Sequence, residues 1–131
     1  MLIDASALTA ILAGEPDGPA FAARIEAATK RLTIPMAMWE TALAVSRIVS
    51  ASISDVEAKM TELIEFLEVE VVTVDAETAR LAIDAHARYG KGRHPAKLNF
   101  GDCFAYAAAR QHGMPLLFKG EDFALTDIRA A

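Results

Sequence analysis

Four acidic residues stand where an apolar run or a polar loop gives way to a helix-like stretch: Asp4, Glu40, Asp102 and Asp122. Asp4 follows the apolar run MLI at the start of the chain, and Asp102 lies shortly after the polar stretch GKGRHPAKLN. Carboxylates gathered at one place repel one another and raise one another's pKa unless cations are bound among them. The four acids are therefore candidate catalytic and metal-binding residues.

The donor atoms of this set indicate which ion and which reaction to expect. Oxygen ligands without His or Cys favour hard ions, so Mg²⁺ is the expected cofactor and Mn²⁺ the alternative. Such ions orient and help to deprotonate a water molecule, and they stabilise charge on the leaving oxygen during phosphodiester cleavage. This chemistry needs no nucleophilic side chain. No glycine-rich phosphate-binding motif points to a nucleotide enzyme instead.

Each acid also has a structural explanation when taken alone. Asp4 and Ser6 could cap the first helix, because short polar side chains accept hydrogen bonds from free N–H groups there. Asn99 and Asp102 have the spacing of a capping box at the start of another helix. Glu40 could be an exposed acid of an early helical turn, and Asp122 could cap a turn. Their combination is harder to explain in this way and favours a metal site, because converging carboxylates repel one another unless divalent cations are bound.

Short β-like runs alternate with longer helical ones along the chain. The expected strands are 1–3, 31–35, 69–74 and 115–118, and the expected helices are 5–14, 18–28, a third ending near 49, 54–67, 75–89 and 101–112. This alternation predicts an α/β/α sandwich with a central, mainly parallel sheet of four or five strands flanked by helices. Parallel sheets bind ligands beyond the carboxyl ends of their strands, where the candidate acids stand.

The bulk composition bounds the class of protein. The chain has 131 residues, enough for one domain over 1–131, and its formal net charge is −5. No apolar run is long enough for a membrane helix, and the single Cys103 suits a reducing compartment, so we expect a cytoplasmic protein. An acidic chain that binds RNA needs a local basic surface. The loop 88–97 supplies one, although it could equally be a solvated loop: Arg88, Lys91, Arg93 and Lys97.

With these residues assembled, the chain resembles a PIN domain, and in size and layout a VapC-type toxin of a toxin–antitoxin pair. The resemblance covers essentially the whole chain and rests on MLIDAS, on Glu40, and above all on NFGDCFAYAAARQHGMPLLFKGEDF. It implies a metal-dependent endoribonuclease whose acidic set is Asp4, Glu40, Asp102 and Asp122. It further implies support from Ser6, a rim position for Asn99, homodimers, and an antitoxin whose segment enters the active-site groove.

Some features leave alternatives open. The family often has Asn where this chain has Glu121, which could join the metal shell, alter the metal preference or point to solvent, and Asp127 is a further acid nearby. Trp39 is expected in the core or in a subunit interface. Two other functions compete with the nuclease: a non-catalytic PIN-fold module that binds RNA or a peptide, and a phosphohydrolase. The phosphohydrolase hypothesis lacks the Asp-x-Asp pair of aspartyl-phosphate chemistry, because Ser6 stands where the second Asp would be.

Overall fold

The computed structural model describes all 131 residues, Met1–Ala131, and contains one parallel sheet. Its four strands lie in the order β3-β2-β1-β4, and they are β1 (Leu2–Ile3), β2 (Leu32–Thr33), β3 (Glu70–Val71) and β4 (Leu116–Leu117). All three strand pairs are parallel. A bridge between Leu116 and Ala130 adds the beginning of a fifth strand beside β4. The predicted parallel sheet of four or five strands is confirmed.

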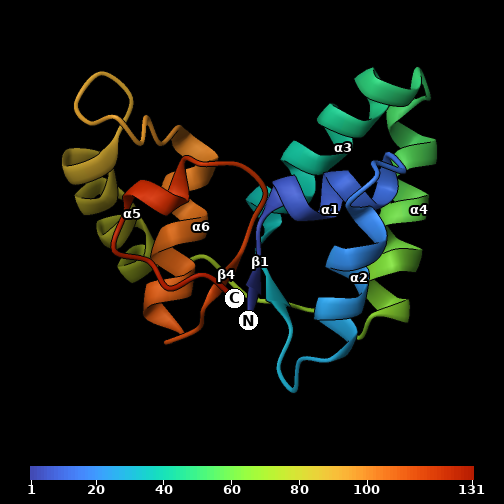
Figure 1. Cartoon of the computed structure of the whole chain (residues 1–131), viewed down its shortest axis with the longest axis horizontal. Helices are drawn as coiled ribbons and strands as arrows, with labels where there is room; N and C mark the ends of the chain where they lie inside the picture. The colour runs from blue at the N-terminus through green and yellow to red at the C-terminus, as the bar shows by residue number, and fades with distance from the viewer.

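Helices cover both faces of the sheet (Figure 1). They are α1 (Ala5–Leu12), α2 (Gly18–Glu26), α3 (Pro35–Val49), α4 (Ile53–Phe66), α5 (Ala76–Tyr89) and α6 (Phe100–Gln111), with a 3-10 turn η1 (Phe123–Leu125) near the end. Helices α5 and α6 form one lobe, and α1 to α4 form the other (Figure 1). We call these the α5–α6 lobe and the α1–α4 lobe. No helix combines the length and the apolar character needed to cross a membrane.

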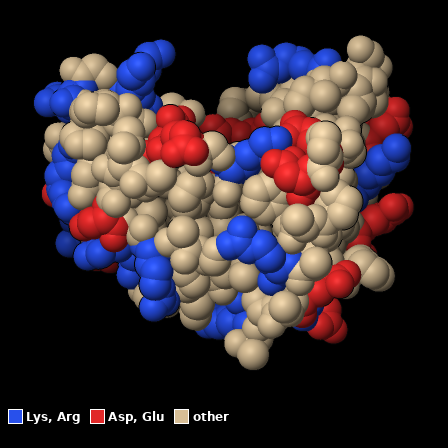
Figure 2. Space-filling model, viewed as in Figure 1, with Lys and Arg blue, Asp and Glu red and all other residues tan.

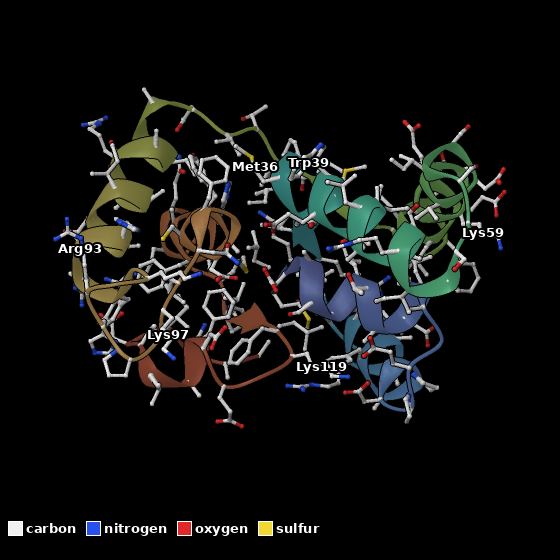
Figure 3. The ribbon with its side chains drawn as sticks, turned by 90° about the horizontal axis from the view of Figure 1, so that it is seen from above. Met36, Trp39, Lys59, Arg93, Lys97 and Lys119 are labelled. Carbon is white, nitrogen blue, oxygen red and sulfur yellow. The ribbon has the colours of Figure 1, made fainter.

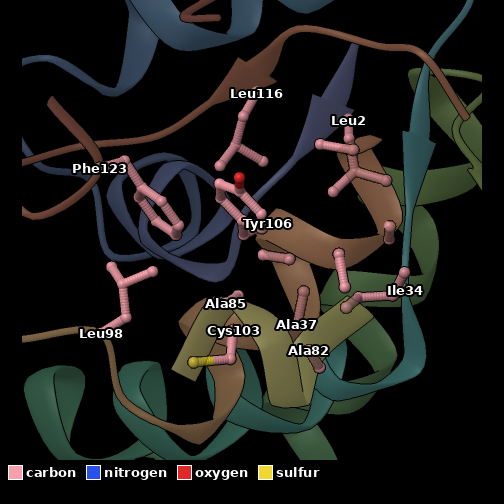
Figure 4. Close-up of a cluster of buried hydrophobic side chains, with 14 of the residues drawn as sticks. Leu2, Ile34, Ala37, Ala82, Ala85, Leu98, Cys103, Tyr106, Leu116 and Phe123 are labelled. Atoms are coloured by element: carbon pink, nitrogen blue, oxygen red, sulfur yellow. The ribbon is translucent and has the colours of Figure 1, made fainter. Parts of the chain in front are cut away.

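The two faces of the sheet carry separate hydrophobic cores because neighbouring residues of a strand point in opposite directions. Leu2 and Leu116 belong to the cluster under α5 and α6, which also contains Ala85 and Tyr106 (Figure 4). Ile3 and Leu117 instead pack with residues of α1, α2 and α4. Small alanines on α6 let this helix lie close to the sheet and to α5. The predicted α/β/α layering is therefore confirmed.

Some element boundaries differ from the sequence prediction. The strand expected over 69–74 is reduced to Glu70–Val71 at the sheet edge, and both of its residues are exposed. Helix α4 starts at Ile53, one residue before the predicted start at 54, because its N-cap Ser52 accepts a hydrogen bond from the Asp55 N–H at 3.1 Å. Trp39 is not in the core, since 65% of its surface is exposed.

Candidate active site

A cavity of about 620 Å³ opens at the carboxyl ends of the strands, between the two lobes. Figure 2 shows the molecule as a notched shape, with acidic side chains at the bottom of the notch and Lys or Arg side chains on top of both lobes. Three of the four predicted acids line this cavity, together with both predicted supporting residues: Asp4, Glu40, Asp102, Ser6 and Asn99. The topology thus brings distant parts of the sequence to one site.

Asp4 is held between β1 and α1. It is the N-cap of α1 and accepts a hydrogen bond from the Ser6 N–H at 3.0 Å, while the Ser6 hydroxyl donates to the same carboxylate oxygen. The Ser6 oxygen in turn accepts from the Lys119 N–H at 2.9 Å, which links the site to the loop after β4. Asp4 is only 3% exposed, and this burial raises its pKa although the Ser6 hydrogen bonds act in the opposite direction. Asp4 is therefore both the N-cap of α1 and a residue of the cavity.

Asp102 is positioned by the start of α6. Its carboxylate accepts from the Asn99 N–H at 2.8 Å, and the Asn99 side chain accepts from the Asp102 N–H at 3.0 Å. The capping box predicted from the spacing of Asn99 and Asp102 is therefore present, and it also holds the Asp102 carboxylate at the cavity. Burial is the main cause that raises the pKa of Asp102 to about 6, and the charges of Asp4 and Asp122 contribute to the same rise.

Glu40 reaches the site from the first half of α3. Its carboxylate lies directly over Gly101 of α6, where a Cβ atom would overlap it. Burial, together with the charges of Asp4 and Asp102, raises the pKa of Glu40 to about 7. Gly101 is thus required by the close approach of a side chain from another helix.

Asp122 lies at the margin of the site. It precedes η1, is exposed, makes no capping hydrogen bond and does not line the cavity, yet its charge contributes to the raised pKa of Asp102. Glu121 is likewise exposed and lines no cavity described here. Of the outcomes predicted for Glu121, the solvent-facing one agrees with its exposure.

The basic loop is separate from the cavity, because none of its four cations lines it. Figure 3 places Arg93 and Lys97 on the outer side of the α5–α6 lobe, whereas Lys119 lies between the lobes. Arg88 is engaged within the chain by an ion pair with Asp127 at 2.9 Å. The Tyr106 hydroxyl donates to the same Asp127 carboxylate. Arg88 and Asp127 therefore both have partners within the protein.

Two further residues of the cavity were not predicted from the sequence. Arg47 and Lys119 line it and bring positive charge to an otherwise acidic wall. Arg47 is seven residues after Glu40, which places both on one face of α3, and this spacing is the one clue the sequence offered. The Lys119 ammonium is held by Glu15 and, at 3.0 Å, by Asp17.

The site fits a hard divalent ion in donor type and in charge. Its donors are carboxylate oxygens, and burial with mutual repulsion makes their ionised forms costly without a cation. No group of three or more His, Cys, Asp or Glu side chains is arranged to surround one ion. Water and phosphate oxygens would complete the shell, as is usual for Mg²⁺, which keeps much of its hydration.

Comparison with known proteins agrees with this arrangement. The model of the PIN domain family matches residues 1–128. Ribonuclease VapC30 of Mycobacterium tuberculosis is 45% identical over 129 residues, which cover 98% of this chain and 95% of that protein. Ribonuclease VapC of Mycolicibacterium smegmatis is 42% identical over 131 residues, covering 99% and 98%. A VapC ribonuclease of Rhizobium meliloti is 40% identical over 138 residues, covering 96% and 97%.

Proposed function

This chain belongs to the PIN-domain family, and we propose that it is a metal-dependent endoribonuclease of the VapC type. One observation carries the proposal: three carboxylates, from the junction of β1 and α1, from α3 and from α6, line a single cavity at the carboxyl ends of a parallel sheet. Full-length similarity to proteins named VapC ribonucleases supports RNA as the substrate. Mg²⁺ is the proposed ion and Mn²⁺ the alternative.

Each residue of the site has a proposed role. Asp4, Glu40 and Asp102 would hold the ion, with Asp122 joining them from the margin. The bound ion would supply an activated water and stabilise the leaving oxygen. Ser6 keeps the Asp4 carboxylate fixed through its two hydrogen bonds, and Asn99 keeps the start of α6 in register so that Asp102 faces the cavity.

The decisive experiment replaces Asp102 by Asn, which retains the size of the side chain and its ability to accept from the Asn99 N–H. We expect cleavage of total RNA and transfer RNA to fall at least about a hundredfold, because a proposed metal ligand is lost. Wild type and Asp102→Asn are assayed with Mg²⁺, with Mn²⁺ and with chelator, and circular dichroism checks that the variant is folded. Equal cleavage by the two proteins, or cleavage in chelator, would contradict the proposal.

The proposal extends to partners and location. We propose that the protein is the cytoplasmic toxin of a toxin–antitoxin pair, and that a cationic antitoxin segment binds in the acidic cavity. We also propose a homodimer, supported by an apolar surface on α3, α5 and α6 where Trp39, Ile83 and Phe100 are 65%, 70% and 70% exposed. Large exposed apolar residues of this kind mark interaction surfaces. Light scattering of the purified chain measures the oligomeric state.

A PIN-fold module that binds RNA or a peptide without cleaving it remains the second candidate. The observation that favours it is the lack of three acidic, His or Cys side chains arranged around one point. Isothermal titration with Mg²⁺ separates the two candidates. Binding at millimolar concentration that is lost in Asp102→Asn supports the nuclease, whereas no binding by folded wild type supports the module.

A further inference from the structure

Arg47 differs from Lys119, the other cation of the acidic cavity. It lies in the last turn of α3, is exposed, and makes no salt bridge and no side-chain hydrogen bond. The other cation of the cavity, Lys119, is already held by Glu15 and Asp17. Arg47 is therefore the one cavity cation whose hydrogen-bond donors are all free for a ligand.

The placement of Arg47 relative to the acids is set by the helix. Glu40 and Arg47 are seven residues apart in the continuous helix α3, so their Cα atoms are about 10 Å apart at ~1.5 Å per residue. Both line the same cavity, with Leu43 and Ala44 between them. A stacked single strand covers this distance in about three nucleotides at ~3.4 Å each. A strand with its scissile phosphate at the acids would thus pass Arg47 within a few nucleotides.

We propose that Arg47 binds a backbone phosphate of the RNA on the α3 side of the cavity. This inference rests on the proposed nuclease function. A guanidinium matches a phosphate through two parallel N–H donors. A guanidinium without a partner in the protein also offsets the repulsion between the acidic cavity and an incoming polyanion. Arg47 thereby fixes the direction in which the strand leaves the acidic site along α3. It contacts a phosphate that does not react, so its effect falls on binding.

The competing explanation is that Arg47 only complements the dipole at the C-terminal end of α3. Arg24 provides the matched control, because it occupies the last turn of α2, is exposed, makes no salt bridge and does not line the cavity. Replacement of either residue by Ala removes one charge from one helix end. Only Arg47→Ala removes a cavity cation.

Binding is measured in a cleavage-deficient Asp102→Asn background, so that the RNA stays intact. Fluorescence anisotropy with a labelled mixed-sequence single-stranded RNA is followed over a range of salt concentrations. We expect Arg47→Ala to weaken binding about tenfold and to reduce the slope of log K against log salt by about 0.7, the value for one phosphate contact. Arg24→Ala is expected to leave both quantities unchanged, and Arg47→Lys to retain the salt slope.

A second measurement uses the enzyme with Asp102 intact on transfer RNA. We expect Arg47→Ala to raise KM about tenfold with kcat nearly unchanged, whereas Arg24→Ala matches wild type. If wild type cleaves RNA and the two Ala variants behave alike, the role of Arg47 is overturned while the nuclease stands. If folded wild type neither binds nor cleaves RNA, the proposed function fails, and the role of Arg47 fails with it.

Discussion

Two clusters of ionisable groups in this molecule are built on opposite principles. In the cavity, Asp4 is buried and Glu40 and Asp102 are partly buried, and the charges of Asp4 and Asp102 add to the raised pKa of Glu40. On the α5–α6 lobe, Asp127 accepts from the Tyr106 hydroxyl and from Arg88 at 2.9 Å, and these partners lower its pKa. The cavity cluster places like charges together, whereas the second cluster pairs the Asp127 carboxylate with a cation and a hydroxyl donor.

The difference separates a functional arrangement from a structural one. A paired cluster stabilises the chain by itself, because each charge finds its partner inside the protein. A cluster of like charges costs folding free energy and is useful only when a ligand supplies the missing charge. The cavity therefore has the features of a binding site, while the Arg88–Asp127 pair attaches the C-terminal segment to α5 and α6. Three experiments test this distinction.

The largest effect is expected for Gly101→Ala. The new methyl group would overlap the Glu40 carboxylate and push it away from the site, so we expect cleavage to fall about 10- to 100-fold. Ala is the better helix former, so the free energy of unfolding should be unchanged or higher by ~0.5–1 kcal/mol.

A double-mutant cycle with Glu40→Ala serves as the control for Gly101→Ala. If displacement of the Glu40 carboxylate is the cause, adding Gly101→Ala to Glu40→Ala should cost no further activity. Additive losses in kcat/KM would show instead that the methyl group acts elsewhere in the site.

A smaller effect is expected on the pH dependence of metal-free stability. Glu40 and Asp102, with pKa values of about 7 and about 6, bind more protons in the folded chain than in the unfolded one between about pH 4 and 7. The stability from these groups is therefore present at low pH and lost as pH rises. In chelator, we expect unfolding free energy to drop by about 1–3 kcal/mol between pH 5 and pH 8, after allowance for partial exposure.

Urea unfolding at several pH values measures this loss, and the Asp102→Asn variant should show a shallower slope. Added Mg²⁺ should restore stability at pH 8, since it binds the folded state. Asp127 behaves in the opposite sense, because its lowered pKa makes its contribution present above its unfolded pKa and lost on acidification. Stability in chelator that rises steadily from pH 5 to pH 8 would contradict the proposed cost of the cavity acids.

The smallest effect is expected for Tyr106→Phe on the paired cluster. It removes the hydroxyl that donates to Asp127 from a side chain that is 2% exposed, so we expect the free energy of unfolding to fall by about 1 kcal/mol. RNA cleavage should stay within about twofold of wild type, because neither residue lines the cavity. A large loss of cleavage with normal stability would remove the distinction between the two clusters.

The sequence predicted those features that depend on local signals. The alternation of short strands and helices was enough for the layered fold, and the rule that sites form beyond strand ends was enough to bring Asp4, Glu40 and Asp102 to one cavity. The capping box of Asn99 and Asp102 was also readable, because it depends on a spacing of three residues.

Features that depend on distant contacts were not predictable. The contact of Glu40 with Gly101 joins residues far apart in sequence, and so does the pairing of Arg88 with Asp127 that removes Arg88 from the free basic loop. The start of α4 was misplaced because Ser52 and Ser54 both offer a capping hydroxyl, and only packing chooses between them. Exposure of Trp39 likewise has no local signal, since an apolar residue on a helix is expected to be buried.

The strand order has a consequence for biosynthesis. β1 lies in the interior of the sheet, and one of its two neighbours is β4, which follows all the other strands in the sequence. Asp4 is therefore synthesised well before Asp102, and β4 is added later still. A prematurely terminated chain that lacks these residues has no complete acidic site, so an interrupted round of synthesis would release a fragment unable to cut RNA by the proposed mechanism.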